Sequence, residues 1–135
     1  MDYTRLTNLE VTGDLKAGTI HGVSAVADVT ATAGGAAIPA GVTHVNVTAT
    51  NAAHIVVLPE PVIGQVITLI NGATGYELRS SDPAAIGING GTAANAESEV
   101  AANTVVVVRC VSETNWIGQT FAATGVVGVL QVAAA

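Results

Sequence analysis

Short runs of alternating β-branched residues dominate this chain, and almost none of these runs carries a charge. The pattern covers residues 29–59 and returns in residues 114–135. Alternation with a period of two is typical of β-strands that bury one face. Charged residues make up 10% of the chain, whereas an ordinary globular domain contains about 25%. A chain of this kind has to cover its surface, and we therefore expect assembly with further copies or with a larger particle rather than catalysis.

The apolar residues are almost all aliphatic. The 135 residues are 50% hydrophobic but only 3% aromatic. A core of Val, Ile, Leu and Ala is thin, which suits closely packed sheets. The length fits one domain. We expect an all-β fold, with an antiparallel β-sandwich or barrel-like body over residues 29–135 and an extended N-terminal arm over residues 1–28.

The first half of the body contains three segments with strand patterns. Residues 42–49 alternate strictly, which predicts one polar and one apolar face. Residues 54–59 are apolar almost throughout and end at a proline, so we expect a central strand that is covered on both faces. Residues 64–70 lead into Asn71-Gly72, a dipeptide that favours a tight hairpin, with residues 76–79 as the returning strand.

The second half adds further strands. Residues 104–111 have the highest β-branched content and predict the strongest strand. Residues 86–91 predict a short strand that runs into a glycine loop, and residues 97–100 predict an edge strand. Residues 121–135 are small and apolar, and such a segment invites strand addition when it is exposed. We therefore expect this C-terminal segment to lie at a subunit interface.

The charge, the cysteine content and the hydropathy argue against nucleic-acid binding, an intrachain disulfide and a membrane span. The net charge is −6, and the basic side chains Arg5, Lys16, Arg79 and Arg109 are scattered, which argues against nucleic-acid binding. The lone Cys110 excludes an intrachain disulfide and is expected to be a small core residue. No apolar stretch is long enough to predict a membrane span, and no secretory signal is recognisable, so we expect synthesis in a cytoplasm.

Two histidines form the best candidate metal site. His44 and His54 would face each other if their strands formed a hairpin, while His21 joins no cluster. Zinc sites use three or four protein ligands, and no third ligand lies near these two in the sequence. We expect structural or surface roles for the histidines, with no metal and no cofactor.

The candidates for catalysis are equally sparse. Glu97 and Glu99 are spaced to share one face of a strand, and Asp82 is the other acid near them, but no apolar setting that would shift a carboxyl pKa is recognisable. Charged edge residues that block aggregation explain them better. The serines lack the strand–elbow–helix context of a nucleophile; they are Ser80, Ser81 and Ser112. We expect that the chain is not an enzyme.

Two further features have a binding and a structural interpretation. Residues 87–91 are glycine-rich, but a phosphate cradle also needs a following helix and a lysine or magnesium ligand. A glycine hairpin is the better interpretation. Trp116 is the sole tryptophan and is either a carbohydrate platform or a plug at the end of a β-core. The plug is favoured, because sugar sites usually stack several aromatic rings.

Several segments in order along the chain resemble small β-rich virion proteins of tailed bacteriophages, including head decoration (cement) and head-fibre proteins. The opening residues 6–15 are also similar to the arms of trimeric phage fibre and spike proteins. The segments that carry the first resemblance are residues 54–59, 64–71, 86–91 and 101–111 with Asn115-Trp116. They specify strands and turns rather than a site.

The resemblance implies a homotrimer that sits on the capsid surface of the virion and clamps neighbouring copies of the major capsid protein. Its partners would then be itself and the major capsid protein, with no nucleic acid and no membrane. A weakly binding arm gains affinity when three copies engage together. We expect the arm to make the capsid contacts through its apolar side chains, which are Leu6, Leu9, Val11, Leu15 and Ile20. The alternative is a trimeric domain of a phage tail fibre that serves in receptor binding or as a spacer.

Overall fold

The computed structural model describes residues 25–132, and over these residues the chain forms strands and turns without a helix. The strands are β1 (Val26–Thr30), β2 (Ala36–Ala37), β3 (His44–Thr48), β4 (Ile55–Val57), β5 (Val66–Asn71), β6 (Tyr76–Arg79), β7 (Gly87–Ile88), β8 (Ser98–Val100), β9 (Thr104–Ser112), β10 (Asn115–Ala122), β11 (Val127–Val129) and β12 (Gln131–Val132). The all-β prediction is confirmed.

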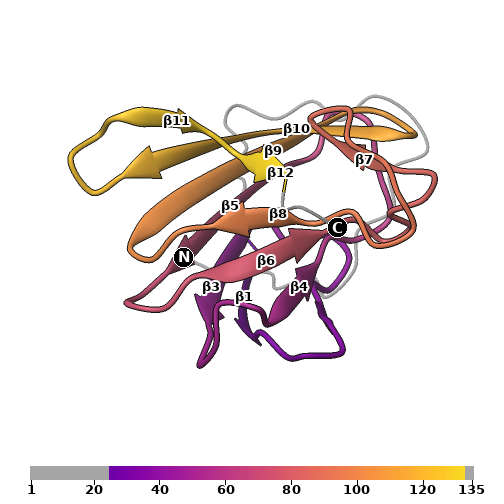
Figure 1. Ribbon diagram of the computed structural model, residues 1–135. Helices are drawn as coiled ribbons and strands as arrows, with labels where there is room; N and C mark the ends of the chain where they lie inside the picture. The colour runs from indigo at the N-terminus through magenta and orange to yellow at the C-terminus, as the bar shows by residue number, and fades with distance from the viewer. Residues whose placement is uncertain (1–24, 133–135) are drawn as a thin grey trace, which may run out of the picture.

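Two open sheets pack against each other (Figure 1). The larger sheet has the order β1-β3-β5-β9-β10-β11, with β7 added beside β10, and the smaller sheet has the order β12-β8-β6-β4-β2. Neither sheet closes on itself within residues 25–132. The barrel-like alternative is therefore wrong for this part of the chain.

The first six strands alternate between the two sheets. The chain enters the larger sheet with β1, crosses to the smaller sheet with β2, returns with β3, and repeats this path through β6. Strands that return to the same sheet pair in parallel, so β1, β3 and β5 form one parallel set and β2, β4 and β6 form another. Parallel neighbours need a crossover connection, and here the strand in the opposite sheet is that crossover. The prediction of an antiparallel fold is wrong for this half of the chain, which forms a short coil of three turns.

The predicted hairpin at Asn71 and Gly72 does not exist. The strand before it, β5, pairs with β3 and β9 in the larger sheet, whereas β6 pairs with β4 and β8 in the smaller sheet. The chain therefore crosses between the sheets at this dipeptide. Asn71 is buried and uses its side chain to bind the backbone around residues 101–104.

The second half of the chain covers the coil with mainly antiparallel strands. In the larger sheet, β9 pairs with β5 and β10, and β10 pairs with β11. The predicted strong strand over residues 104–111 is confirmed as β9. In the smaller sheet, β8 lies between β6 and β12. The expected edge strand over residues 97–100 is therefore wrong, because two residues of the C-terminal segment, Gln131 and Val132, pair along its outer side.

The core lies between the two sheets and is mainly aliphatic, as the composition predicts. Strand β3 shows the expected alternation, with Val45 and Val47 buried and the residues on either side more exposed. Each fully buried aliphatic side chain contributes about 1.5–3 kcal/mol relative to an exposed one. The largest core side chains are Trp116, Tyr76, Leu58, Ile67, Leu69, Leu78 and Leu130. Trp116 is fully buried and fills the core.

Candidate functional site

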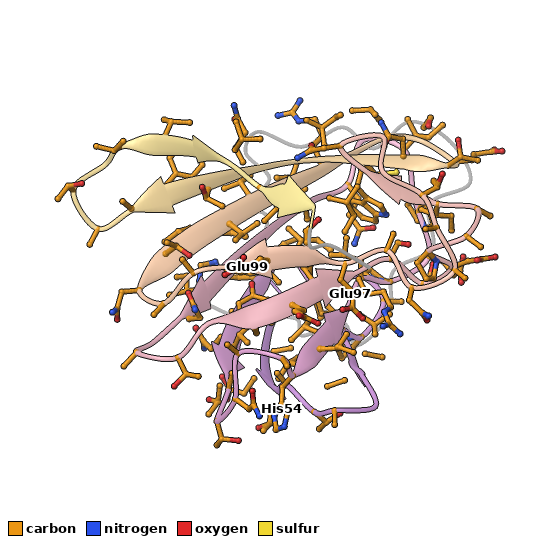
Figure 2. The ribbon with its side chains drawn as sticks, in the orientation of Figure 1. His54, Glu97 and Glu99 are labelled. Carbon is orange, nitrogen blue, oxygen red and sulfur yellow. The ribbon has the colours of Figure 1, made fainter. Side chains whose placement is uncertain are left out.

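The two candidate metal-binding histidines belong to different parts of the fold. His44 begins β3 in the larger sheet, whereas His54 precedes β4 and places Nδ1 3.2 Å from the carbonyl oxygen of Ala31 (Figure 2). Within residues 25–132, no three His, Cys, Asp or Glu side chains come together as a candidate metal site. The structure thus places His54 against the backbone of Ala31, 23 residues earlier, and does not bring His44 and His54 into one cluster.

The three acidic candidates each lie in different surroundings and do not form one group. Glu97 forms an ion pair with Arg79, and Glu99 lies exposed on β8 opposite Glu77 of β6 (Figure 2). Asp82 stabilises its own turn, because its carboxylate accepts a hydrogen bond from the Ala84 N–H at 3.2 Å. None of these arrangements places two carboxyl groups across a cavity.

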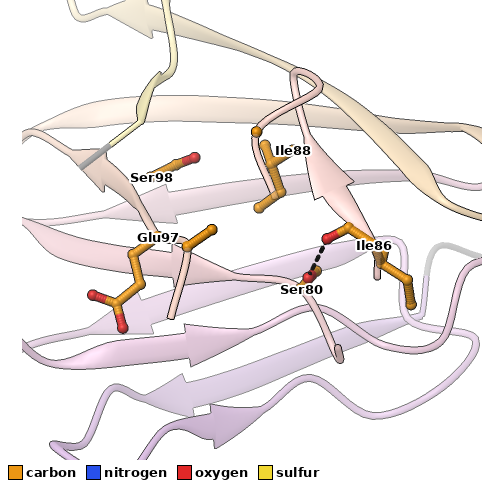
Figure 3. A pocket seen from close by; sticks show the side chains of 7 residues that line it. Ser80, Ile86, Ile88, Glu97 and Ser98 are labelled. Atoms are coloured by element: carbon orange, nitrogen blue, oxygen red, sulfur yellow. Dashed lines mark hydrogen bonds between the residues drawn. The ribbon is translucent and has the colours of Figure 1, made fainter. Parts of the chain in front are cut away.

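The serines bind backbone or stand in turns. Ser80 is buried and donates a hydrogen bond of 2.6 Å from Oγ to the carbonyl oxygen of Ile86. Figure 3 shows this bond in a crevice between Ile86, Glu97 and Ser98, which leaves no room for a water molecule. Ser112 accepts a hydrogen bond from the Thr114 N–H. These contacts explain Ser80 and Ser112 without a catalytic role.

The glycine-rich loop after β7 has its N–H groups occupied. The N–H groups of Gly87 and Asn89 donate to the carbonyl oxygens of Thr114 and Trp116, at 2.9 and 2.8 Å. The Gly90 N–H donates to the side chain of Asn115. A phosphate cradle needs free N–H groups, so the structural interpretation of this loop holds. Its strained residue, Asn89, has a φ of 52° and ties the loop to β10 through its amide.

Trp116 and Cys110 lie side by side on paired positions of β10 and β9, and both point into the core. The core-plug interpretation of Trp116 is confirmed, and a carbohydrate platform is wrong because the ring is fully covered. Burial raises the pKa of the Cys110 thiol. The arm residues predicted to touch a capsid, Leu6, Leu9, Val11, Leu15 and Ile20, lie outside the described residues.

The outward face of the larger sheet divides into two halves. Strands β1 and β3 turn mostly polar side chains outward, and Asn46 donates a hydrogen bond of 2.8 Å to Asp28. Strands β5, β9, β10 and β11 turn mostly apolar side chains outward in register. We call these the apolar half-face; its members are Val66, Ile70, Val105, Val107, Val111, Ile117, Phe121, Val127 and Val129.

One row of the apolar half-face is apolar across all four strands, and the next row contains Thr68 and Gln119 beside Val107 and Val129. Ile70, Val105, Phe121 and Val127 are successive cross-strand partners from β5 to β11. Exposure is highest at the sheet edge, where Val129 is 76% exposed. Monomeric proteins rarely expose a contiguous apolar patch larger than a few hundred Å². This surface is the strongest candidate site among the described residues.

Arg109 is the one charged side chain within the apolar half-face. It is exposed and stands between its cross-strand partners Val66 and Ile117, with Val107 and Val111 on either side along β9. The only ion pair among residues 25–132 joins Arg79 to Glu97, so Arg109 has no acidic partner within this part of the chain. A guanidinium in this setting can extend over apolar neighbours and still offer several donors at its tip.

Sequence analysis expected residues 121–135 at a subunit interface, and Phe121, Val127 and Val129 of the half-face belong to that segment. It did not name the members on β5 and β9, although one signal pointed to them. The uninterrupted valines of residues 105–108 are typical of a strand that is covered on both faces, and residues 25–132 cover only the inner face of β9. Residues 25–132 also contain no helix that is long and apolar enough to span a bilayer. Comparisons of the chain with protein-family models, with curated proteins and with solved structures find no match.

Proposed function

We propose that this chain is a structural virion protein, which decorates and stabilises a phage capsid as a homotrimer bound to the major capsid protein. The observation that carries the proposal is the apolar half-face. A surface that residues 25–132 leave uncovered can be covered by neighbouring copies, and the low charge of the whole chain suits a protein held in a multi-copy coat.

The energetic argument rests on the area that association would remove from water. Apolar burial contributes about 25 cal/mol for each Å², and a stable interface buries about 800 Å² on each partner. The apolar half-face spans four strands and includes Ile117, Val127 and Val129, all of them well exposed. Association through this half-face would remove these side chains from water, whereas the polar half on β1 and β3 is suited to water.

A coat protein needs no reactive centre, since its work consists of many weak contacts repeated over a shell. Three linked copies engage a surface with far higher affinity than one copy does. The mainly aliphatic side chains of the apolar half-face agree with a role that needs no reactive groups. Residues 3–20 remain the proposed capsid-binding segment, and residues 26–28 of the expected arm belong to β1 of the larger sheet.

The oligomeric half of the proposal is tested by light scattering on the full chain after size exclusion. We expect trimers for the wild type and dissociation for Val129→Asp, because an uncompensated carboxylate in an apolar contact costs several kcal/mol. Thr48→Asp adds the same charge to the polar half of the same outward face and should leave the trimer intact. Equal behaviour of the two variants would exclude the apolar half-face as the contact.

The capsid half is tested separately with a variant that lacks residues 1–20. Wild-type trimers should bind undecorated heads, and the shortened trimers should not. Shortened trimers that still decorate heads would refute the arm assignment. Wild-type protein that ignores heads but binds host cells or glycans would support the tail-fibre alternative instead.

A further inference from the structure

An open cavity lies at one corner of the coil. It occupies about 350 Å³ and is lined by the turn before β3 and the turn before β5. Pro59 and Val62 line it from the turn before β5, Ala40 and Thr43 line it from the turn before β3, and Val62 is 63% exposed. Glu60, the one charged lining residue, is itself exposed. The cavity is therefore suited to a small apolar group rather than to a charged ligand.

A projecting hairpin with matching chemistry lies at the end of β10. Figure 1 shows the β10–β11 hairpin extending beyond the neighbouring strands. Its turn is closed by a hydrogen bond of 2.8 Å from the Gly125 N–H to the carbonyl oxygen of Ala122, and Gly125 adopts a φ of 81°. Val126 follows at the tip and is 65% exposed. The tip is thus a preformed apolar knob without a charged residue.

The hairpin tip and the cavity lie at opposite ends of the larger sheet. The cavity precedes Val66, which pairs with Arg109 at the beginning of β5. The tip follows Phe121, which pairs with Val105, and Val105 pairs with Ile70 near the end of β5. At about 3.3 Å for each residue, the two features are on the order of 20 Å apart along the strands. One copy cannot insert its own tip into its own cavity.

We propose that the β10–β11 tip of one copy seats in the cavity of the next copy, with Val126 against Pro59 and Val62. This inference rests on the homotrimer of the proposed function. A contact between two different patches is heterologous, and such contacts close into rings when the rotation permits. A self-complementary contact cannot by itself produce a trimer.

Two features of the chain favour a second copy as the occupant. Exposed apolar side chains lie between the tip and the cavity on the outward face, with Gln119 and Arg109 among them; they are Val127 and Val129 on β11, Ile117 on β10 and Val111 on β9. The Gly64 N–H binds the carbonyl oxygen of Cys110 beside the cavity. A second copy that packs on the apolar half-face would therefore also lie next to the opening of the cavity. The closed turn also lowers the ordering cost of insertion.

The test is crosslinking of the full-length variant Val62→Cys/Val126→Cys with a short bismaleimide. Cys110 is buried and does not compete. We expect covalent dimers and trimers on a denaturing gel, and covalent dimers alone when the two single-cysteine variants are mixed. The matched control replaces Val62→Cys by Thr30→Cys, an exposed position at the far end of β1, and should remain mostly uncrosslinked.

The outcomes separate this inference from the proposed function. Wild-type trimers in light scattering, together with an uncrosslinked Val62/Val126 variant, would overturn the tip-in-cavity contact and leave the homotrimer standing. Equal crosslinking of the Thr30 control would overturn it as well. Wild-type monomers would refute both proposals. Val126→Asp provides a second measurement, since it should raise the trimer dissociation constant by at least tenfold.

Discussion

At the scale of single residues, two asparagine side chains hold the turns to the sheets. Asn71 donates from Nδ2 to the carbonyl oxygens of Thr74 and Ala101, each at 3.0 Å, and its Oδ1 accepts from the Thr104 N–H. Asn89 similarly joins its loop to Gly118. The Asn-Gly dipeptide predicted a hairpin because this pair of residues is common in tight turns. The dipeptide could not indicate that the Asn71 amide would bind the backbone of Ala101, 30 residues further along the chain.

Replacing Asn71→Asp tests this assignment with almost no change in shape. The carboxylate loses both donors and faces two carbonyl oxygens, so we expect a loss of about 2–4 kcal/mol in unfolding free energy. Urea denaturation followed by Trp116 fluorescence, at one protein concentration, measures the loss. Asn51→Asp is the control, since Asn51 is exposed and its side chain accepts one bond from the Ala53 N–H. Similar losses in the two variants would contradict the account.

Tyr76 carries a buried hydroxyl group without a hydrogen-bond partner. Burial therefore raises the pKa of Tyr76 above its usual value of about 10. The folded protein retains this proton at pH values where the unfolded chain releases it. The stability that Tyr76 contributes is present below about pH 10 and is lost as the pH rises toward the folded-state pKa.

At pH 7, the unfolding free energy of Tyr76→Phe should equal that of the wild type or exceed it by up to about 1 kcal/mol, because the substitution removes no hydrogen bond. Above about pH 10 the wild type should lose up to about 1.4 kcal/mol more per pH unit than the variant. Cys110 contributes in the same direction in both proteins, so the difference isolates Tyr76. Urea denaturation between pH 7 and 11 provides the comparison, and parallel pH profiles would refute it.

At the scale of elements, alternation and strand content were predictable, but pairing was not. The buried Val45 and Val47 and the long β9 follow directly from their patterns. Hydrophobic alternation with a period of two indicates which face of a strand is buried, but it does not indicate which strand pairs with it. The coil of β1 to β6 could not be predicted in this way. The sequences of β5 and β6 show the same local pattern whether the two strands pair with each other or belong to different sheets.

Gly118 shows how closely β10 packs against the rest of the core. A Cβ atom at this position would lie 2.8 Å from Leu130 Cδ2 and 3.2 Å from Val108 Cγ1. We expect Gly118→Ala to cost about 1–3 kcal/mol through overpacking, measured by the same urea denaturation. Gly72→Ala is the control, since a Cβ atom there meets nothing within 4 Å. A neutral Gly118→Ala would show that β10 is packed less tightly than described.

At the scale of the whole molecule, the candidate site is a surface rather than a pocket of reactive groups. Sequence analysis evaluated the histidines, acids and serines singly, and the fold leaves them apart or engaged in local contacts. The apolar half-face could not be recognised in the same way, because Ile70, Val105, Phe121 and Val127 come from four strands. The signals in the sequence were the low charge of the chain, the uninterrupted valines of residues 105–108 and the apolar C-terminal segment, and none of them shows which residues share one face.

The most direct test of this account is sedimentation equilibrium of the full chain across a micromolar concentration series. The account predicts a species of three times the 13.3 kDa chain mass, with dissociation confined to the lowest concentrations. A stable, well-behaved monomer of 13.3 kDa throughout the series would contradict it, since no second copy would then cover the apolar half-face.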